Sequence, residues 1–222
     1  MARKVYLMER VFWLLYHPFA WAYDWVSWVV SAGRWQKWVR SVIALLEGPC
    51  VLEIGFGPGH LQIWLYECGF RAFGVDESRN MVRLAQRRLR RSGVVGRLVR
   101  ARAEALPFRW ESFDTVVATF PGDYIWAENT LESIWRVLRP GGHLVLLLGA
   151  APGGKGLFLR FLRWLFRITA QDSRVSDFQR QITEYLWARN YLNVTWKISD
   201  YNEDRIWILA AQKAHGHTSQ EM

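Results

Sequence analysis

The chain has 222 residues, of which 51% are hydrophobic, so it can bury one full core, and a disordered or fibrous protein is excluded. The net charge of +9 favours anionic partners such as nucleic acid, acidic lipid or acidic protein, or else reflects only a solvated basic face. Cys50 and Cys68 are too few for a disulfide framework, and the five histidines lack ligand spacing, so we expect a reducing compartment and no metal.

The first 45 residues are rich in apolar and aromatic side chains, and we interpret them as a helical cap (residues 1–45) broken near Pro18 and Gly33. Pro18 and Asp24 interrupt the most apolar part, whereas a membrane-spanning helix needs about 20 mostly apolar residues. A signal peptide is also disfavoured, because Glu9 lies against a short apolar stretch. We therefore expect a protein that is cytoplasmic, either free or peripheral at the membrane.

From residue 46 onward the pattern changes to strands that alternate with helices, which predicts one α/β domain over residues 46–214 and a flexible tail at 215–222. Ser78 is a predicted N-cap, and Asn129 with Glu132 resembles a cap pair that opens a later helix. The predicted strands are 50–54, 70–75, 97–101, 114–119 and 142–148, and the predicted helices include 59–68 and 79–91.

The last third of the chain has a different pattern. Ser176 and Gln179 resemble a capping box for one more helix. Residues 193–199 and 205–212 flank a polar turn and predict an antiparallel pair at the edge of the sheet. The whole chain therefore predicts an α/β, Rossmann-like fold, with a seven-stranded, mostly parallel sheet, an antiparallel last strand and helices on both faces.

The most informative motif is the segment 51–60. A buried strand ends in a turn with glycine at every second position, Gly55, Gly57 and Gly59, and an apolar helix follows. Glycine is required where backbone approaches a ligand closely, and the first helical turn offers unpaired N–H groups to that ligand. A dinucleotide-binding turn has the longer G-x-G-x-x-G spacing, but here His60 stands where its third glycine would fall. The shorter turn favours a ligand without a phosphate.

Two acidic residues narrow the choice of ligand. Glu53 lies at the end of the first strand, where a carboxylate can pair with an ammonium group. Asp76 ends the next strand, 19 residues after Gly57, and can accept hydrogen bonds from ribose hydroxyls. A ligand with a ribose, an amino-acid ammonium and no phosphate is S-adenosyl-L-methionine.

Over most of its length the chain resembles the class I S-adenosylmethionine-dependent methyltransferases. The segments that resemble motifs of this family, in the expected order, are 51–60, 74–78, 103–108, 112–117 and 136–142. The resemblance implies that the glycine turn and Glu53 hold the methionine part of the cofactor, Asp76 its ribose and the backbone of Ala103 its adenine. The predicted cofactor-binding residues are Glu53, Gly55, Phe56, Gly57, Gly59, Asp76, Glu77, Met81, Ala103, Glu104, Thr119 and Phe120.

Three of the positions near the cofactor carry an alternative or a departure. Met81 is equally well explained as core filling on a helix. Arg102 stands where the family usually carries a short polar or acidic residue beside the adenine, and Pro58 where many members carry a small hydroxyl residue. These two departures predict weaker cofactor binding than is usual in the family.

The segment 119–124 follows the fourth predicted strand, beside the expected methyl group. Methyl transfer from a sulfonium is an in-line displacement, in which the protein mainly aligns the reactants and excludes water. Asp123 and Tyr124 are candidate catalytic residues that take a proton from the acceptor, and the alternative is an ordinary loop acid and a packing tyrosine. The segment lacks the Asn/Asp-Pro-Pro-aromatic box, which disfavours a DNA adenine or glutamine methyltransferase.

The acceptor is predicted from two elaborations of the fold. Residues 16–38 resemble the cap of the ubiquinone/menaquinone C-methyltransferase family, and Tyr23, Trp35 and Pro121 are the predicted substrate residues. Residues 156–168 place arginines on one face of a very apolar helix, which suits an anionic membrane surface, a lid over the substrate, or a core helix with a solvated stripe. The first two interpretations predict a small, lipophilic acceptor such as a quinol or a lipid headgroup.

Two other functions stay open. The arginines within 87–91, with Arg97, Arg100 and Arg102, suit a methyltransferase of RNA or protein, but no aromatic residues lie among them for base stacking, so nucleic acid is disfavoured. A non-catalytic protein that keeps the cofactor fold only to bind partners is disfavoured by the intact glycine turn and by Asp76.

Overall fold

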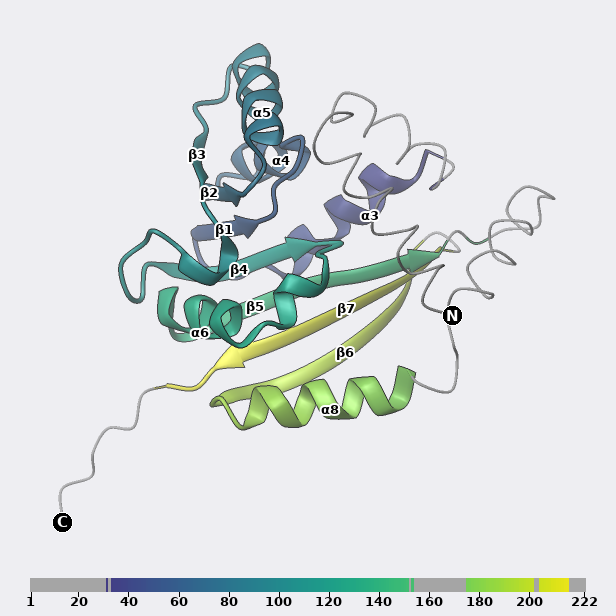
Figure 1. The fold of residues 1–222 in the computed structure, drawn as a ribbon. Coiled ribbons are helices and arrows are strands. Elements are labelled where there is room, and N and C mark those ends of the chain that lie inside the picture. The colour runs from purple at the N-terminus through teal and green to yellow at the C-terminus, as the bar shows by residue number, and fades with distance from the viewer. Residues whose placement is uncertain (1–30, 32, 152, 154–174, 202–203, 216–222) are drawn as a thin grey trace, which may run out of the picture.

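The computed structural model describes residues 31, 33–151, 153, 175–201 and 204–215. Within these residues seven strands form one sheet in the order β3-β2-β1-β4-β5-β7-β6 (Figure 1). The strands are β1 (Cys50–Ile54), β2 (Arg71–Asp76), β3 (Arg97–Arg100), β4 (Phe113–Thr119), β5 (Leu138–Ala151), β6 (Tyr191–Tyr201) and β7 (Asp204–Lys213). Strands β1 to β5 pair in parallel, and β7 is antiparallel to both of its neighbours, β5 and β6. The predicted sheet is confirmed.

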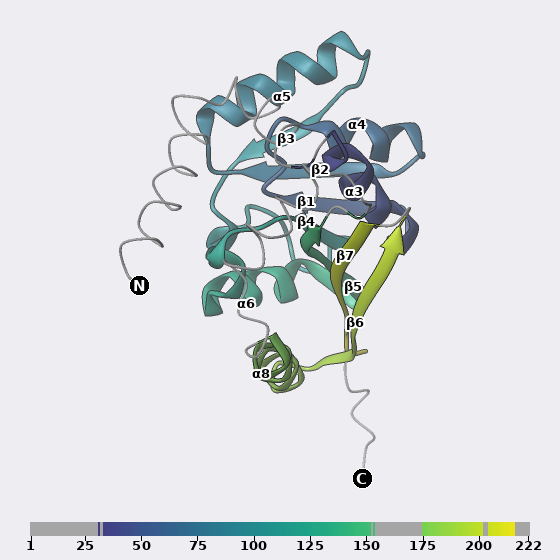
Figure 2. The ribbon, with the colours of Figure 1, turned by 90° about the vertical axis from the view of Figure 1, so that its right-hand side faces the viewer.

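The helices lie on both faces of this sheet, as predicted. The α-helices of the described residues are α3 (Trp35–Ser41), α4 (His60–Glu67), α5 (Arg79–Arg91), α6 (Glu128–Val137) and α8 (Val175–Trp187). The described residues also form three 3-10 helices, η2 (Val42–Leu45), η3 (Ala103–Ala105) and η4 (Asp123–Trp126). Figure 2 shows α3, α4 and α5 on one side of the sheet and α6 and α8 on the other.

Alternation along the central strands divides the core between these two layers. In β1, Val51 belongs to the cluster that contains α3 and α4, whereas Leu52 and Ile54 belong to the cluster that contains α6 and α8. Neighbouring residues of a strand point to opposite faces of the sheet, so the apolar residues of β1 contribute to both clusters. Because all five residues of β1 are buried, its carboxyl end is a rigid support for the turn that follows.

Helix α5 forms as its sequence predicts. The side chain of Ser78 accepts a hydrogen bond from the backbone N–H of Met81 and caps the helix. Met81, Ala85 and Leu89, spaced four residues apart, are buried. This stripe holds the helix against the sheet and leaves its opposite face in solvent.

The predicted caps of two later helices are wrong. Helix α6 begins at Glu128 with Ala127 at the N-cap and without a side-chain cap, because Leu131 N already donates to Ala127 O at 3.0 Å. Asn129, expected to open the helix, therefore lies inside its first turn. Helix α8 likewise already includes Ser176, the expected N-cap.

The N-terminal layer is attached to the sheet through Asp204, the first residue of β7, which is 2% exposed. Its Oδ1 accepts hydrogen bonds from the Arg34 guanidinium and from Gly153 N (2.9 Å), and its Oδ2 accepts one from Trp38 Nε1 (2.7 Å). We call this group the Asp204 clamp. It fixes α3, the described helix of the predicted cap, on the sheet, while the domain division at residue 45 stays a prediction.

Candidate active site

The glycine turn between β1 and α4 combines close packing with open space. Gly57 and Gly59 adopt φ angles of +51° and +84°, which favour glycine. A Cβ on Gly59 would lie 2.8 Å from the Cβ of Ala85, so this glycine lets α4 and α5 approach each other. A Cβ on Gly57 would meet nothing within 4 Å. Gly57 therefore borders the open side of the turn, where a ligand has room.

Gly55 brings the turn against the segment that follows β4. Its φ is +71°, and a Cβ here would lie 2.7 Å from the hydroxyl oxygen of Tyr124. The hydroxyl of Tyr124, on η4, therefore lies against the glycine turn. Asp123, the other candidate catalytic residue, is exposed. Only Tyr124 of this pair is placed by the structure against the turn.

Asp76 is the carboxylate that fixes the turn in place. It is 8% exposed; its Oδ2 accepts a hydrogen bond from Gly57 N (2.9 Å) and its Oδ1 one from Ser78 N (2.8 Å). Burial raises the pKa of Asp76, the two backbone hydrogen bonds lower it, and nearby Glu77 raises it. A carboxylate oxygen accepts more than one hydrogen bond, so Asp76 can hold the turn and also bind ligand hydroxyls.

Glu53 is a second buried carboxyl beneath the turn. It is 2% exposed, and its Oε2 accepts a hydrogen bond from Gln62 Nε2 at 2.8 Å. Burial raises the pKa of Glu53 to about 8. The hydrogen bond from Gln62 lowers this pKa, and the negative charge of Asp76 raises it further. Within the described residues no cation pairs with Glu53. A buried carboxyl in this state favours a bound cation, such as an ammonium group.

The predicted adenine side of the site lies beyond the tip of β2. Ala101 N donates to Asp76 O at 3.3 Å, which brings the buried Ala103 of η3 close to this tip. Met81 is fully buried on α5, which agrees with its interpretation as core filling. Arg102 lies between two acids of this side, 3.7 Å from Glu77 and 3.4 Å from Glu104. The unusual arginine is therefore paired with Glu77 and Glu104, both predicted cofactor residues.

Aromatic rings gather where β4 and α3 meet the turn. Phe120 follows Thr119 at the end of β4, with a φ of +50° and its N–H bonded to Leu147 O at 2.7 Å. The ring of Trp35 stacks on Phe120 with the centroids 6.4 Å apart, and it meets His60 edge to face at 5.7 Å. We call Trp35, His60 and Phe120 the aromatic group. Pro121, half-buried, follows directly.

Sequence reasoning missed the residues that support the turn from α4 and α5. Gln62 holds Glu53, and Arg88 Nη1 donates to Pro58 O at 2.8 Å. Gln62 had a signal, since it is a polar residue within an otherwise apolar stretch that directly follows the glycine turn. Arg88 had none that separates it from its arginine neighbours. Two predicted elements of the substrate site, Tyr23 and the segment 156–168, lie outside the described residues.

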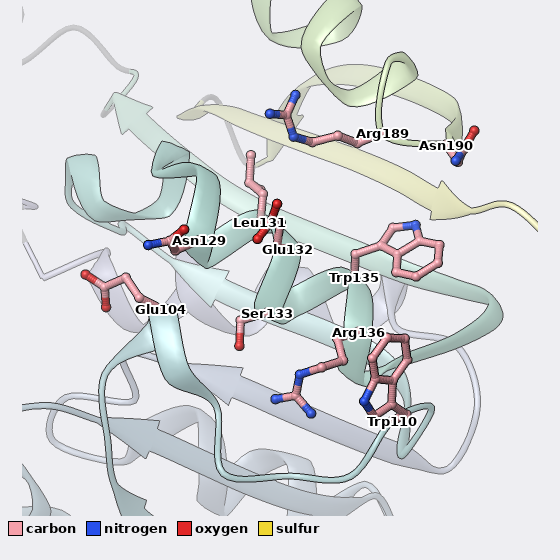
Figure 3. Close-up of a pocket in the computed structure, with 10 residues that line it drawn as sticks. All are labelled: Glu104, Trp110, Asn129, Leu131, Glu132, Ser133, Trp135, Arg136, Arg189 and Asn190. Carbon is pink, nitrogen blue, oxygen red and sulfur yellow. The ribbon is translucent and has the colours of Figure 1, made fainter.

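A cavity lined by described residues lies away from the turn. Its volume is about 620 Å³, and it lies over α6 between η3 and the end of α8 (Figure 3). Its lining residues are Glu104, Trp110, Asn129, Leu131, Glu132, Ser133, Trp135, Arg136, Arg189 and Asn190. Of the predicted cofactor residues only Glu104 lines it. This cavity is therefore separate from the site defined by Gly57 and Asp76.

The described part of the chain contains no group of three His, Cys, Asp or Glu residues that could hold a metal ion. It also contains no helix of the length and hydropathy needed to cross a membrane.

Comparison with known proteins gives one consistent class. A family described as a methyltransferase domain matches residues 51–142. A ubiquinone/menaquinone biosynthesis C-methyltransferase of Blochmanniella floridana is 32% identical over 187 residues, which cover 77% of this chain and 72% of that protein. An uncharacterized methyltransferase of Bacillus subtilis (strain 168) is 32% identical over 118 residues, which cover 51% of this chain and 63% of that protein.

Solved structures share the fold at low sequence identity. A SAM-dependent methyltransferase from Aquifex aeolicus superposes with a TM-score of 0.59 at 16% identity, covering 81% of this chain and 92% of that one. Phosphoethanolamine N-methyltransferase 2 of Haemonchus contortus, in complex with S-adenosyl-L-methionine, gives a TM-score of 0.57 at 18% identity, covering 82% and 53%.

The strand order, the glycine turn after β1 and the acid at the tip of β2 define a Rossmann-like methyltransferase. The chain belongs to the class I S-adenosylmethionine-dependent methyltransferases, and S-adenosyl-L-methionine is its methyl donor. The described residues suit this donor, because Gly57 borders open space, Glu53 lacks a cation and Asp76 keeps free lone pairs.

Proposed function

We propose that this enzyme methylates a small, lipophilic acceptor, quinol-like or lipid-like, at the carboxyl end of β4. The aromatic group supports this proposal, because stacked and edge-to-face rings beside the glycine turn favour an apolar, flat acceptor over a charged one. The relative from Blochmanniella floridana carries the name of a quinone C-methyltransferase, which agrees with the same class of acceptor.

The two buried carboxyls and the turn support the place that we propose for the cofactor. Glu53 binds the ammonium of the methionine part, Asp76 binds the ribose hydroxyls, and the backbone at Ala103 borders the adenine. The bound sulfonium supplies the methyl group. The chain's own residues orient it, and the rings around Phe120 keep water away from the transfer.

The acceptor must lose one proton as its new bond to the methyl carbon forms and the sulfur–methyl bond breaks. Tyr124 is the residue we propose to hold or pass on this proton, because its hydroxyl lies against Gly55 whereas Asp123 is exposed. We predict that Tyr124→Phe lowers the turnover rate at least tenfold and leaves the dissociation constant for S-adenosyl-L-methionine within about twofold, since the ring is kept. Asp123→Asn should change the turnover rate by less than about threefold. A larger loss of turnover in Asp123→Asn than in Tyr124→Phe would assign the proton transfer to Asp123 instead.

The acceptor class is tested by product analysis. The enzyme is incubated with methyl-labelled S-adenosyl-L-methionine in three parallel reactions. One contains a lipid and quinone extract, one contains total RNA, and one contains a protein extract. We expect label in a quinone-like or lipid product, and Trp35→Ala should reduce that product without weakening cofactor binding. Label confined to RNA or protein would contradict the proposed acceptor while leaving the methyl-transfer activity intact.

A further inference from the structure

The entire net charge of the chain comes from one short segment. Residues 79–102 contain nine arginines and no acidic residue, whereas the rest of the chain contains 20 basic and 20 acidic residues. This segment forms α5, the turn after it, β3 and the approach to η3. Figure 1 shows α5 and β3 together at the end of the molecule opposite β6 and α8. The other residues of the chain therefore carry no net charge in sum.

The helix presents its arginines on a single side. With about 100° between successive residues, the five exposed arginines of α5 fall within an arc of about 120° opposite the buried stripe. We call the eight exposed arginines of the segment the basic face; they are Arg79, Arg83, Arg87, Arg90, Arg91, Arg97, Arg100 and Arg102. Arg88 is not included, because it is half-buried and bonded to Pro58.

Apolar side chains are exposed within this charged surface. Val95, in the turn between α5 and β3, is 79% exposed, and Val99, on β3, is 36% exposed. Strand β3 lies at the edge of the sheet, and in the described structure it pairs only with β2. The basic face therefore contains exposed valines that would gain by leaving water.

Most of the basic face is not neutralised by the described residues. Arg102 is paired with Glu77 and Glu104, but no described acid pairs with Arg83, Arg87 or Arg91. Guanidinium groups bind phosphate with paired hydrogen bonds, so a set of free arginines on one side suits a surface of phosphate groups.

We propose that the basic face docks on an anionic lipid surface, with the arginines on the lipid phosphates and Val95 and Val99 at the headgroup boundary. Residues 79–102 contain no aromatic side chain on which a nucleic-acid base could stack, whereas exposed valines suit a lipid surface. Arg100 Nε donates to Glu77 O at 2.9 Å, so one end of the face borders the tip of β2. The docked enzyme would thus hold its cofactor edge near the membrane. The proposal concerns binding alone and does not depend on the acceptor.

Vesicle flotation with the full chain tests this docking. The wild type should bind vesicles of phosphatidylcholine mixed with phosphatidylglycerol and should not bind vesicles of phosphatidylcholine alone. Its binding should weaken as the salt concentration increases. Arg83→Gln/Arg87→Gln/Arg90→Gln should weaken binding on the order of 100-fold, since each basic group near an anionic surface contributes about fivefold to the affinity. Thermal unfolding and cofactor affinity, which this face should not affect, check that the variant is folded.

A matched variant separates the basic face from net charge. Arg109→Gln/Arg180→Gln/Lys197→Gln removes the same three charges from exposed positions elsewhere and should bind vesicles within about threefold of the wild type. Equal weakening by both triple variants would overturn the proposal. The proposal would also be overturned if the wild type did not bind the anionic vesicles. Binding of RNA through the same arginines, in a salt-sensitive complex and without vesicle binding, would count against it in the same way.

The valines provide a second, independent readout. Val95→Asp adds an acid and removes an exposed apolar side chain, whereas Ser92→Asp adds the same charge on the same turn without that loss. We expect Val95→Asp to weaken vesicle binding several-fold more than Ser92→Asp. Equal effects would show that Val95 does not enter the lipid.

Discussion

Glu53 is a carboxyl whose charge depends on whether a cation lies beside it. Burial raises its pKa to about 8, so the free enzyme holds Glu53 protonated at neutral pH. An ammonium group binds the carboxylate form, so cofactor binding must release a proton below that pH. We predict that the dissociation constant for S-adenosyl-L-methionine falls up to tenfold per pH unit from about pH 6 to about pH 8. Calorimetry in buffers of different ionisation enthalpy measures both the affinity and the proton.

The variant Glu53→Gln should bind the cofactor more weakly and lose this pH dependence. Folding gives a second check: because the folded pKa lies above the ordinary 4.5, the free energy of unfolding should decline as pH rises from 4.5 to about 8, and less so in Glu53→Gln. A wild type whose affinity is flat over this range would show that Glu53 does not meet the ammonium.

Tyr191 is a buried residue with an unsatisfied polar atom. It is fully buried, its hydroxyl has no hydrogen-bond partner among the described residues, and burial raises its pKa. Such a hydroxyl costs about 1–3 kcal/mol, so Tyr191→Phe should raise the free energy of unfolding by about 1 kcal/mol in urea titrations. The exposed Tyr66→Phe should change it by less than about 0.5 kcal/mol. A large loss in Tyr191→Phe would mean that the hydroxyl has a partner.

The sequence predicted how Glu53, Gly57 and Asp76 come together, because adjacent parallel strands bring their carboxyl ends to the same edge of the sheet. It did not predict that Asp76 also holds the turn through Gly57 N, or that Gln62 holds Glu53. These contacts depend on side-chain directions from α4 and β2, which residue spacing alone does not give.

The Asp204 clamp is the polar contact that joins helix α3 to the sheet, next to the apolar packing of Trp38 and Val39. Asp204→Ala leaves the Trp38 N–H without its acceptor and the Arg34 guanidinium with only the carbonyl of Gly153, and it should lower the free energy of unfolding by about 3 kcal/mol. Glu184→Gln breaks the exposed pair with Arg180 and should cost less than about 0.5 kcal/mol. Urea titration compares the two variants; similar small effects would show that α3 is held by other contacts.

Strands were more predictable than helix ends at the level of elements. The predicted strand at 50–54 coincides with β1, because a short run between turn residues that is apolar except for Glu53 favours a buried strand. Helix starts depend on which carbonyl accepts the first hydrogen bond, and at α6 this is Ala127, a residue without a capping side chain. Strand β5 extends to Leu138 because it pairs with Phe113 across a register shift that the sequence pattern does not show.

Two features of the whole molecule emerge only in three dimensions. The arginines of residues 79–102 are visible in the sequence, but the structure shows that they share one end of the molecule with exposed valines. The cavity over α6 is assembled from η3, α6 and the end of α8, which are far apart in sequence. Composition gives the net charge, and only the arrangement of α5 and β3 shows on which surface of the molecule that charge lies.

The cofactor site at the tips of β1 and β2 is tested most directly by comparing two substitutions of glycine by valine. Gly57→Val and Gly69→Val place the same side chain at a positive φ with nothing within 4 Å, so their folding costs should be similar, but only Gly57 lies in the glycine turn. Calorimetric titration with S-adenosyl-L-methionine should show binding at least 100-fold weaker for Gly57→Val and unchanged within about twofold for Gly69→Val. Wild-type affinity in a folded Gly57→Val would contradict this account of the site.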